Sequence, residues 1–132
     1  MALPECEGAA RAWVRATNST AGQRVYFAMP QQDRPELPCV VLYRVGGIPD
    51  WHGQDYPDLV LECWGATKHE ASALASFLAN EVEQSNHKSP VILDGVKVMA
   101  GSVNFGPVPN GGTDWAKRYR LDVSFHMRAV SP

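Results

Sequence analysis

A run of alternating residues near the C-terminal end constrains the fold more than any other feature. Every second residue from 119 to 127 is apolar, and the residues between them are polar or charged. The apolar members are Tyr119, Leu121, Val123, Phe125 and Met127. Successive side chains of a strand point to opposite faces, so the pattern predicts a strand over 118–128 with one buried face. The other face is left to water or to a partner, as is typical of antiparallel sheets.

Two segments have the apolar spacing of helices. From Glu5 to Asn18, small and apolar residues fall on one face at helical intervals. A second helix is predicted from Thr67 to Asn86, and its first residues have the form of a capping box. We expect the Thr67 hydroxyl to accept a hydrogen bond from the Glu70 amide. The Glu70 carboxylate is expected to reach back to the Thr67 amide.

The remaining strands follow from composition and from the Gly and Pro residues that bound them. The predicted order is helix, three strands, helix, two strands. We therefore predict an α+β fold with a mainly antiparallel, possibly mixed, sheet of about five strands and both helices packed on one face. The chain of 132 residues has the length of a single domain, so we expect one domain over 1–132. The strands before the last one are predicted at Arg24–Phe27, Cys39–Val45, Asp58–Trp64 and Lys97–Phe105.

Two connections are longer than a hairpin needs, namely 46–57 and 106–116. Each contains one tryptophan among Gly, Pro and Asp residues, Trp51 in the first and Trp115 in the second. Long loops without secondary structure are usually functional or disordered, and a large aromatic residue favours function. We predict that Trp51, Trp115 and the neighbouring His52 and Tyr56 contact a partner. The alternative is that each tryptophan folds back as a lid on its own domain.

The polar face of the last strand is rich in basic residues. Arg118, Arg120 and Arg128 lie on it together with His126, and only Asp122 opposes them. One interpretation is a solvated face protected against aggregation. The other is a face that meets an acidic neighbouring subunit or passing nucleic acid. The net charge of −2 does not predict tight nucleic-acid binding by the chain as a whole.

No residue pattern indicates catalysis or metal binding. The four histidines are scattered, no phosphate-binding loop or nucleophile elbow is present, and we expect no cofactor, no metal and no enzymatic activity. Asp50, Asp55 and Asp58 crowd one segment, which we interpret as a solvated turn. Cys6, Cys39 and Cys63 lack the spacing of a zinc site and are predicted to be reduced, buried thiols. No apolar run is long enough for a membrane span and no secretory signal is visible, so a cytoplasmic protein is expected.

Several stretches together resemble one family. These are Arg24–Tyr26 with Pro30, the run Leu37–Val41, the strand end Glu62–Gly65 and the Ala-rich helix from Glu70 to Ala75. This arrangement, over about Arg24 to Arg128, resembles the phage tail terminator (tail-completion) proteins. The family's motifs are an order of strands and a helix, without a catalytic signature.

The resemblance implies a subunit of a hexameric ring that caps the finished tail tube. The ring ends polymerisation of the major tail protein and offers a surface to the head connector, with DNA passing through the lumen without sequence-specific binding. It also implies a location in the virion, at the junction of tail and head, after assembly in the host cytoplasm. Three alternatives stay open: a head–tail connector or other neck subunit, a non-viral protein-binding module, and an enzyme of unrecognised type.

Overall fold

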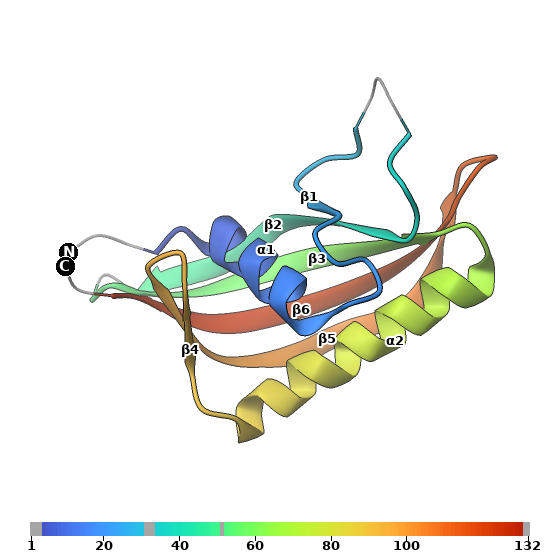
Figure 1. Ribbon diagram of the computed structural model, residues 1–132. Coiled ribbons are helices and arrows are strands. Elements are labelled where there is room, and N and C mark those ends of the chain that lie inside the picture. Colours follow the sequence, from blue (N-terminus) through green and yellow to red (C-terminus); the bar gives the residue numbers. More distant parts are fainter. Residues whose placement is uncertain (1–3, 31–33, 51, 131–132) are drawn as a thin grey trace.

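The computed structural model describes residues 4–30, 34–50 and 52–130, and it consists of one sheet with two helices on one of its faces (Figure 1). The strand order in the sheet is β1-β2-β3-β6-β5-β4, which places β6 between β3 and β5. β1 is parallel to β2 and the other neighbours are antiparallel. The elements are α1 (Cys6–Thr17), β1 (Val25–Tyr26), β2 (Cys39–Asp50), β3 (Gln54–Gly65), α2 (Lys68–Gln84), the 3-10 turn η1 (Ser85–His87), β4 (Val91–Leu93), β5 (Val96–Gly112) and β6 (Lys117–Ala129).

The α+β class, the two helices and the mainly antiparallel sheet with one parallel pair agree with the sequence prediction, whereas the sheet has six strands instead of about five. The additional strand is β4, which pairs with the start of β5. Its three residues lie between Pro90 and the Asp94-Gly95 turn, so the segment is too short to show an alternating pattern. Among the described residues, no helix is long and apolar enough to cross a membrane.

Both helices begin at the residues that the sequence indicates. The Glu5 side chain caps α1 by accepting from the Gly8 amide. At α2, the Thr67 hydroxyl accepts from the Glu70 amide at 3.1 Å, as predicted. The Glu70 carboxylate, however, accepts from the amide of Ala66, not from that of Thr67. The residue before the cap is therefore hydrogen-bonded to the first turn of α2.

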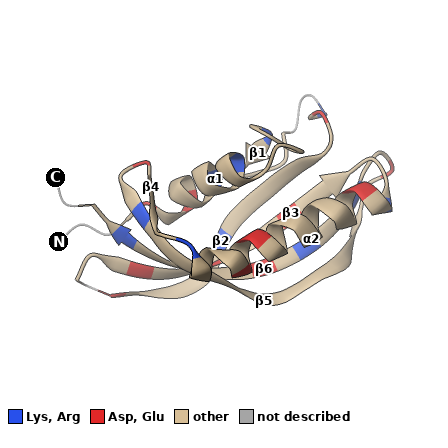
Figure 2. Ribbon diagram, turned by 60° about the horizontal axis from the view of Figure 1, so that its bottom comes forward, with Lys and Arg blue, Asp and Glu red and all other residues tan. Residues whose placement is uncertain are grey.

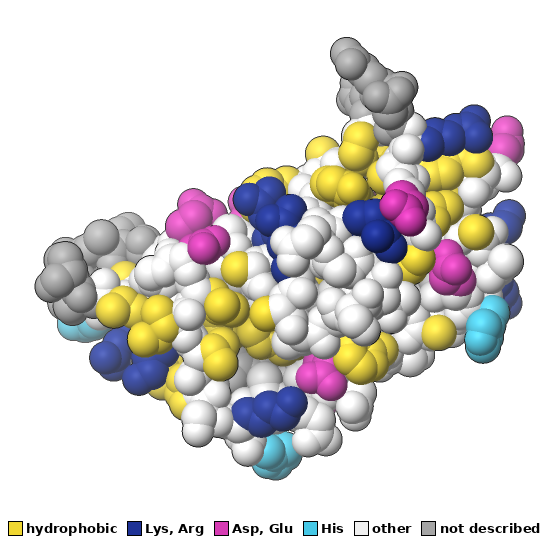
Figure 3. Space-filling model, viewed as in Figure 1, with side chains coloured by type: hydrophobic (Ala, Val, Ile, Leu, Met, Phe, Trp, Pro, Cys, Tyr) yellow, Lys and Arg dark blue, Asp and Glu magenta, His cyan; other side chains and the backbone are white. Residues whose placement is uncertain are grey.

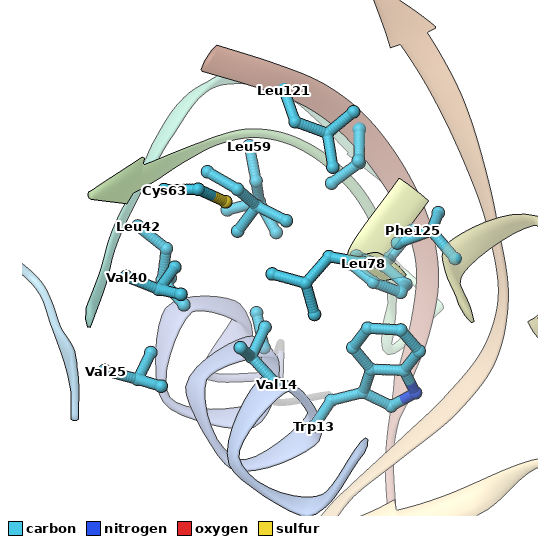
Figure 4. Close-up of a cluster of buried hydrophobic side chains, with 14 of the residues drawn as sticks. Trp13, Val14, Val25, Val40, Leu42, Leu59, Cys63, Leu78, Leu121 and Phe125 are labelled. Carbon is cyan, nitrogen blue, oxygen red and sulfur yellow. The ribbon is translucent and has the colours of Figure 1, made fainter. Parts of the chain in front are cut away.

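The main core lies between the helices and the sheet (Figure 4). Trp13 and Val14 of α1 and Leu78 of α2 point toward the strands, where Leu121 and Phe125 of β6 meet them. The rings of Trp13 and Phe125 pack edge to face, with centroids 5.2 Å apart. Apolar burial of this kind contributes roughly 25 cal/mol per Å². The layer thus joins α1, α2 and the strands into one packed body.

The two predicted long loops are hairpins instead, and this part of the prediction is wrong. β2 and β3 pair up to Asp50 and Gln54, and β5 and β6 pair up to Gly112 and Lys117. The glycines and prolines that indicated loops mark irregularities inside the strands, with register shifts near residues 45, 104, 107 and 111. Trp51 lies outside the described residues.

Gly47 shows why the strand needs a glycine at such a point. Its φ of 100° is in the left-handed region. A Cβ at this position would lie 2.1 Å from the carbonyl oxygen of Tyr56 on the neighbouring strand. Only glycine permits this close approach of two backbones. Gly47 therefore continues the pairing of β2 with β3 and does not end it.

Candidate functional site

The sheet has a second face, which the helices do not cover and which we call the uncovered face. It carries the even-numbered side chains of β3 and β6, because the odd-numbered ones are buried toward the helices. Side chains of directly paired residues on neighbouring strands share a face, which extends it onto β2, β4 and β5. Basic and acidic segments are interspersed along these strands (Figure 2). The described charged or aromatic members include Tyr43, Asp50, Tyr56, Asp58, Glu62, Trp64, Lys97, Phe105, Arg118, Arg120, Asp122, His126 and Arg128.

At one end of the uncovered face, the Glu62 carboxylate contacts three neighbours, two through hydrogen bonds and one through an ion pair. Its carboxylate accepts from the Tyr43 hydroxyl at 3.0 Å and from the Trp64 indole at 3.4 Å. An Arg118 guanidinium nitrogen lies 3.7 Å from the same carboxylate. Burial and the hydrogen bond to Glu62 raise the pKa of Tyr43. Arg118 is therefore neutralised within its own sheet.

Arg120 is paired in the same way. Its guanidinium donates two hydrogen bonds to Asp122, at 2.7 and 3.1 Å. The hydrogen bond to Asp122 raises the pKa of Arg120. The sequence indicated a basic face opposed only by Asp122, and Asp122 is indeed the partner of Arg120. The further acidic partner, Glu62 beside Arg118, comes from β3 and was not visible in the sequence of β6.

Arg128 differs from the other two arginines. It is exposed, and its register neighbours are Lys97 on β5 and Gln54 on β3. Within residues 4–30, 34–50 and 52–130 it makes no ion pair with a carboxylate. Two like charges directly opposite each other on a sheet are unfavourable without an anion nearby. Lys97 was missed by sequence reasoning because only the strand register places it beside Arg128.

The centre of the uncovered face holds a serine, a histidine and an aspartate, but not in a catalytic arrangement. The Ser124 hydroxyl donates to Asp58 and accepts from the Asn104 amide. The His126 ring donates through Nε2 to Gln54 at 2.6 Å, and it stacks on Tyr56 with centroids 4.6 Å apart. A nucleophilic pair requires a hydrogen bond between the serine and the histidine, and this histidine is bonded to Gln54 instead.

Trp115 packs against its own domain. Its ring is half-buried and lies parallel to that of the buried Trp64, with centroids 6.3 Å apart. The Arg34 guanidinium lies over the Trp115 ring, 5.2 Å from its centroid, and that of Arg118 lies over the Trp64 ring, 5.1 Å from its centroid. This arrangement matches the lid alternative for Trp115, although part of the ring stays accessible to a partner.

The other predicted contact residues lie at the opposite end of the sheet. Tyr56 is exposed on the uncovered face, and it pairs across strands with the more exposed Ile48. The His52 ring contacts the Asp50 carboxylate at 2.7 Å in the β2–β3 turn. That hydrogen bond holds the pKa of Asp50 below its usual range. The structure therefore places Tyr56 and His52 far along the sheet from Trp115 and does not join them into one site.

A partly buried ion pair lies on the helix side of the same hairpin. Asp55 is buried and accepts two hydrogen bonds from the Arg44 guanidinium, at 2.7 and 2.8 Å. Burial acts to raise the pKa of the Asp55 carboxyl, but Arg44 outweighs it and the pKa lies below its usual range. The interpretation of Asp55 as part of a solvated turn is therefore wrong, because β3 turns its side chain toward α1, where it also contacts the Cys6 thiol.

The three cysteines are free and buried, as predicted. Cys63 lies in the main core, whereas Cys39 belongs to a smaller cluster on the other side of the sheet, with Val41 and Trp64. Burial raises the pKa of the Cys6 thiol to about 12 and that of Cys39 to about 11. Thiols with such pKa values are poor nucleophiles at neutral pH. No cluster of three or more metal-ligating side chains occurs in the part of the chain that the structure describes.

Comparison with known proteins adds no family: no protein-family model matches the chain, and no curated protein matches it.

Proposed function

We propose that this chain is a phage tail terminator, a structural subunit that forms a hexameric ring on the tail tube and provides the surface for joining the head. The proposal combines the sequence resemblance with one observation. Four large apolar side chains stand exposed on the uncovered face, each from a different strand. They are Ile48 (78 % exposed), Tyr56 (42 %), Ile92 (62 %) and Phe105 (55 %). Ile48 and Tyr56 are direct cross-strand neighbours, and a contiguous exposed apolar patch of this kind is typical of a protein–protein contact.

The polar groups of the uncovered face favour a role in protein contact rather than in catalysis. Within the described residues, no buried side-chain nitrogen or oxygen atom lacks a hydrogen-bond partner. Glu62, Asp58 and Asp122 all have partners within the sheet, so none is held free for a reaction. Polar side chains tied down in this way form a firm surface that loses little entropy when a partner docks.

A ring also needs two different surfaces on each subunit, because contacts around a cyclic ring are heterologous. The uncovered face and the helix layer are two such surfaces on opposite sides of the sheet. We infer that the uncovered face meets the neighbouring subunit, and that the tube and the head connector contact the two rims of the ring.

The proposal is tested by capping of tail tubes. Tubes of the major tail protein are grown with and without the purified chain, and their lengths and ends are imaged by electron microscopy. We expect rings at the tube ends and shorter, uniform tubes. A protein that stays monomeric over a wide concentration range and never occurs on tubes contradicts the proposal. Binding to head portals instead of tubes would indicate a connector or neck subunit.

A matched pair of variants connects capping to the uncovered face. Tyr56→Ser removes a ring that is 42 % exposed on this face, and Phe77→Ser removes one that is 43 % exposed on α2. Both variants should melt close to the original protein, because exposed side chains contribute little to stability. We expect Tyr56→Ser to weaken ring formation at least tenfold. Because α2 belongs to the helix layer, Phe77→Ser tests the second proposed surface separately. Unchanged ring formation by Tyr56→Ser would refute a role for the uncovered face.

A further inference from the structure

A single row of side chains crosses the uncovered face from β2 to β4 near one end of the sheet. Its members are paired directly in register, and neighbouring strands lie about 4.8 Å apart, so each side chain stands next to the following one. In order across the five strands they are Asp50, Gln54, Arg128, Lys97 and Ile92. The row therefore changes from acidic at β2, through basic at β6 and β5, to apolar at β4.

The two cations of this row have no carboxylate to balance them. In the part of the chain that the structure describes, neither Lys97 nor Arg128 makes an ion pair. The other arginines of β6 differ, because Arg118 and Arg120 each have a carboxylate within the sheet. Like charges directly opposite each other destabilise a sheet. An anion that binds between Lys97 and Arg128 removes this unfavourable interaction.

Gln54, on the other side of Arg128, does not supply the missing charge. Its side chain is a neutral amide, and its Oε1 atom accepts from His126 Nε2 at 2.6 Å. The amide group that remains is a hydrogen-bond donor. The Asp50 carboxylate, one strand further along, is bonded to His52. Neither register neighbour of Arg128 therefore offers an acceptor to its guanidinium.

A hollow of about 250 Å³ lies beside the two cations. It is lined by Ile92, Lys97, Arg128, Ala129 and Val130. Ile92 is 62 % exposed and Val130 is 42 % exposed, so apolar surface adjoins the charges. A single water needs only about 10–15 Å³ of such space, so the hollow has room for a carboxylate and a short aliphatic group. In the space-filling view, basic side chains border apolar ones at this end of the molecule, near β4 (Figure 3).

These features favour a protein carboxylate over a nucleic-acid backbone as the anion. A phosphodiester chain carries a charge at every residue and requires an extended basic face. Here the basic part of the row spans two strands, with Asp50 at one end of the row and Ile92 at the other. A carboxylate can accept two parallel hydrogen bonds from the Arg128 guanidinium, while Lys97 adds a second positive charge. An aliphatic neighbour of that carboxylate can then pack against Ile92 and Val130.

We propose that this hollow binds an acidic segment of a partner protein, in which one carboxylate bridges Arg128 and Lys97 and an adjacent aliphatic side chain packs on Ile92. The contact goes beyond the proposed ring, because a single subunit contains all of its residues and binds the segment whether or not the ring forms.

Peptide binding to the isolated chain tests the proposal. The probe is a peptide of alternating leucine and glutamate with blocked ends, added at up to millimolar concentration while the amide signals of the chain are followed by nuclear magnetic resonance. We expect saturable shifts at Ile92, Lys97 and Arg128, and no such shifts with a peptide in which glutamine replaces glutamate. Absence of saturable shifts, or equal shifts with the glutamine peptide, overturns the proposal. Tighter binding of a short DNA strand at the same residues overturns the choice of a protein partner.

Substitutions along the row separate this site from general surface charge. Lys97→Gln and Arg128→Gln should each weaken peptide binding about threefold to fivefold, the scale of an exposed ion pair. Gln54→Glu should weaken it as well, because the new carboxylate pairs with Arg128 from within the sheet. The matched control is Arg120→Gln on the same face, where the arginine is already bonded to Asp122, and binding should stay unchanged. Equal losses in Arg128→Gln and Arg120→Gln would contradict a defined site.

The outcomes are independent of tube capping. Loss of peptide binding with normal rings on tubes overturns this contact and leaves the tail terminator proposal in place. Specific peptide binding by a chain that never caps tubes has the opposite meaning.

Discussion

Along β6, the side chains that point toward the helices and those that point away are stabilised by different means. The first set is apolar and buried, and it includes Leu121, Val123 and Phe125. The second set is polar and mostly half-buried, and the charges of Arg118 and Arg120 are paired with Glu62 of β3 and Asp122 of β6, whereas Arg128 is exposed. One strand thus carries a packed core on one face and a face of paired polar side chains on the other. The comparison teaches that apolar burial stabilises the covered face, while hydrogen bonds and ion pairs organise the uncovered face, which we propose as the contact surface.

The largest expected effect tests this comparison at two adjacent residues. Leu121→Ala removes a fully buried side chain and leaves a cavity, so the free energy of unfolding should fall by about 2–5 kcal/mol. Arg120→Gln, one residue earlier on the uncovered face, should change it by about 1 kcal/mol or less. Urea denaturation of both variants measures the difference. Equal losses would mean that the uncovered face contributes to stability as the core does.

An intermediate effect is expected at Asp55, the charged residue that is buried on the helix side of the sheet. Because the pKa of Asp55 is lowered in the folded protein, its ion pair stabilises the fold above about pH 4, the usual pKa of a free carboxyl. This stabilisation is lost as the pH falls through the folded-state pKa. Asp55→Asn should cost roughly 1–3 kcal/mol at pH 7 and should flatten the loss of stability below pH 4.

The matched control for this prediction is Asp50→Asn in the exposed β2–β3 turn. Asp50 also has a lowered pKa, but its partner is the exposed His52, so its substitution should change the melting temperature much less. Thermal melting from pH 2 to pH 7 separates the two variants. An Asp55→Asn protein with the same acid profile as the original protein would show that the ion pair is not coupled to folding.

The smallest expected effect concerns Trp115, whose half-buried ring is intermediate between the buried and the exposed side chains compared above. Its stack on Trp64 should contribute roughly 0.5–1.5 kcal/mol beyond simple burial. Trp115→Ala should therefore lower the melting temperature slightly, shift the near-ultraviolet circular dichroism of Trp64, and leave self-association intact. An unchanged melting temperature combined with lost association would instead make Trp115 an anchor for a partner.

Elements with a clear period were predictable from the sequence, and their bounds agree with the structure to within a few residues. The apolar spacing of α1 and α2 and the alternation of β6 reflect one-sided burial, which a single segment records by itself. The two hairpins were misread because Gly47, Pro49 and Pro107 look like loop residues. Their role inside a paired strand depends on the neighbouring backbone, which no local pattern contains.

The candidate surface was predictable only in part for a related reason. The sequence placed Arg118, Arg120 and Arg128 on one face of the last strand, and the structure agrees. Their partners depend on strand register: Glu62 lies next to Arg118 in space but far from it in the chain, and Lys97 lies next to Arg128. Like the exposed Ile92 on β4, these neighbours become visible only when the sheet order is known.

The central place of β6 also governs the order in which the sheet can form. Among the strands, β6 comes last along the chain, yet it separates β3 from β5 and pairs with both over most of its length. Its contacts with β3 join residues that are far apart in sequence, so their formation is slow compared with that of the hairpins. Until β6 is inserted, β3 and β5 each present an unpaired edge lined with apolar side chains. A chain that is cut before Lys117 should therefore aggregate instead of folding as a smaller domain.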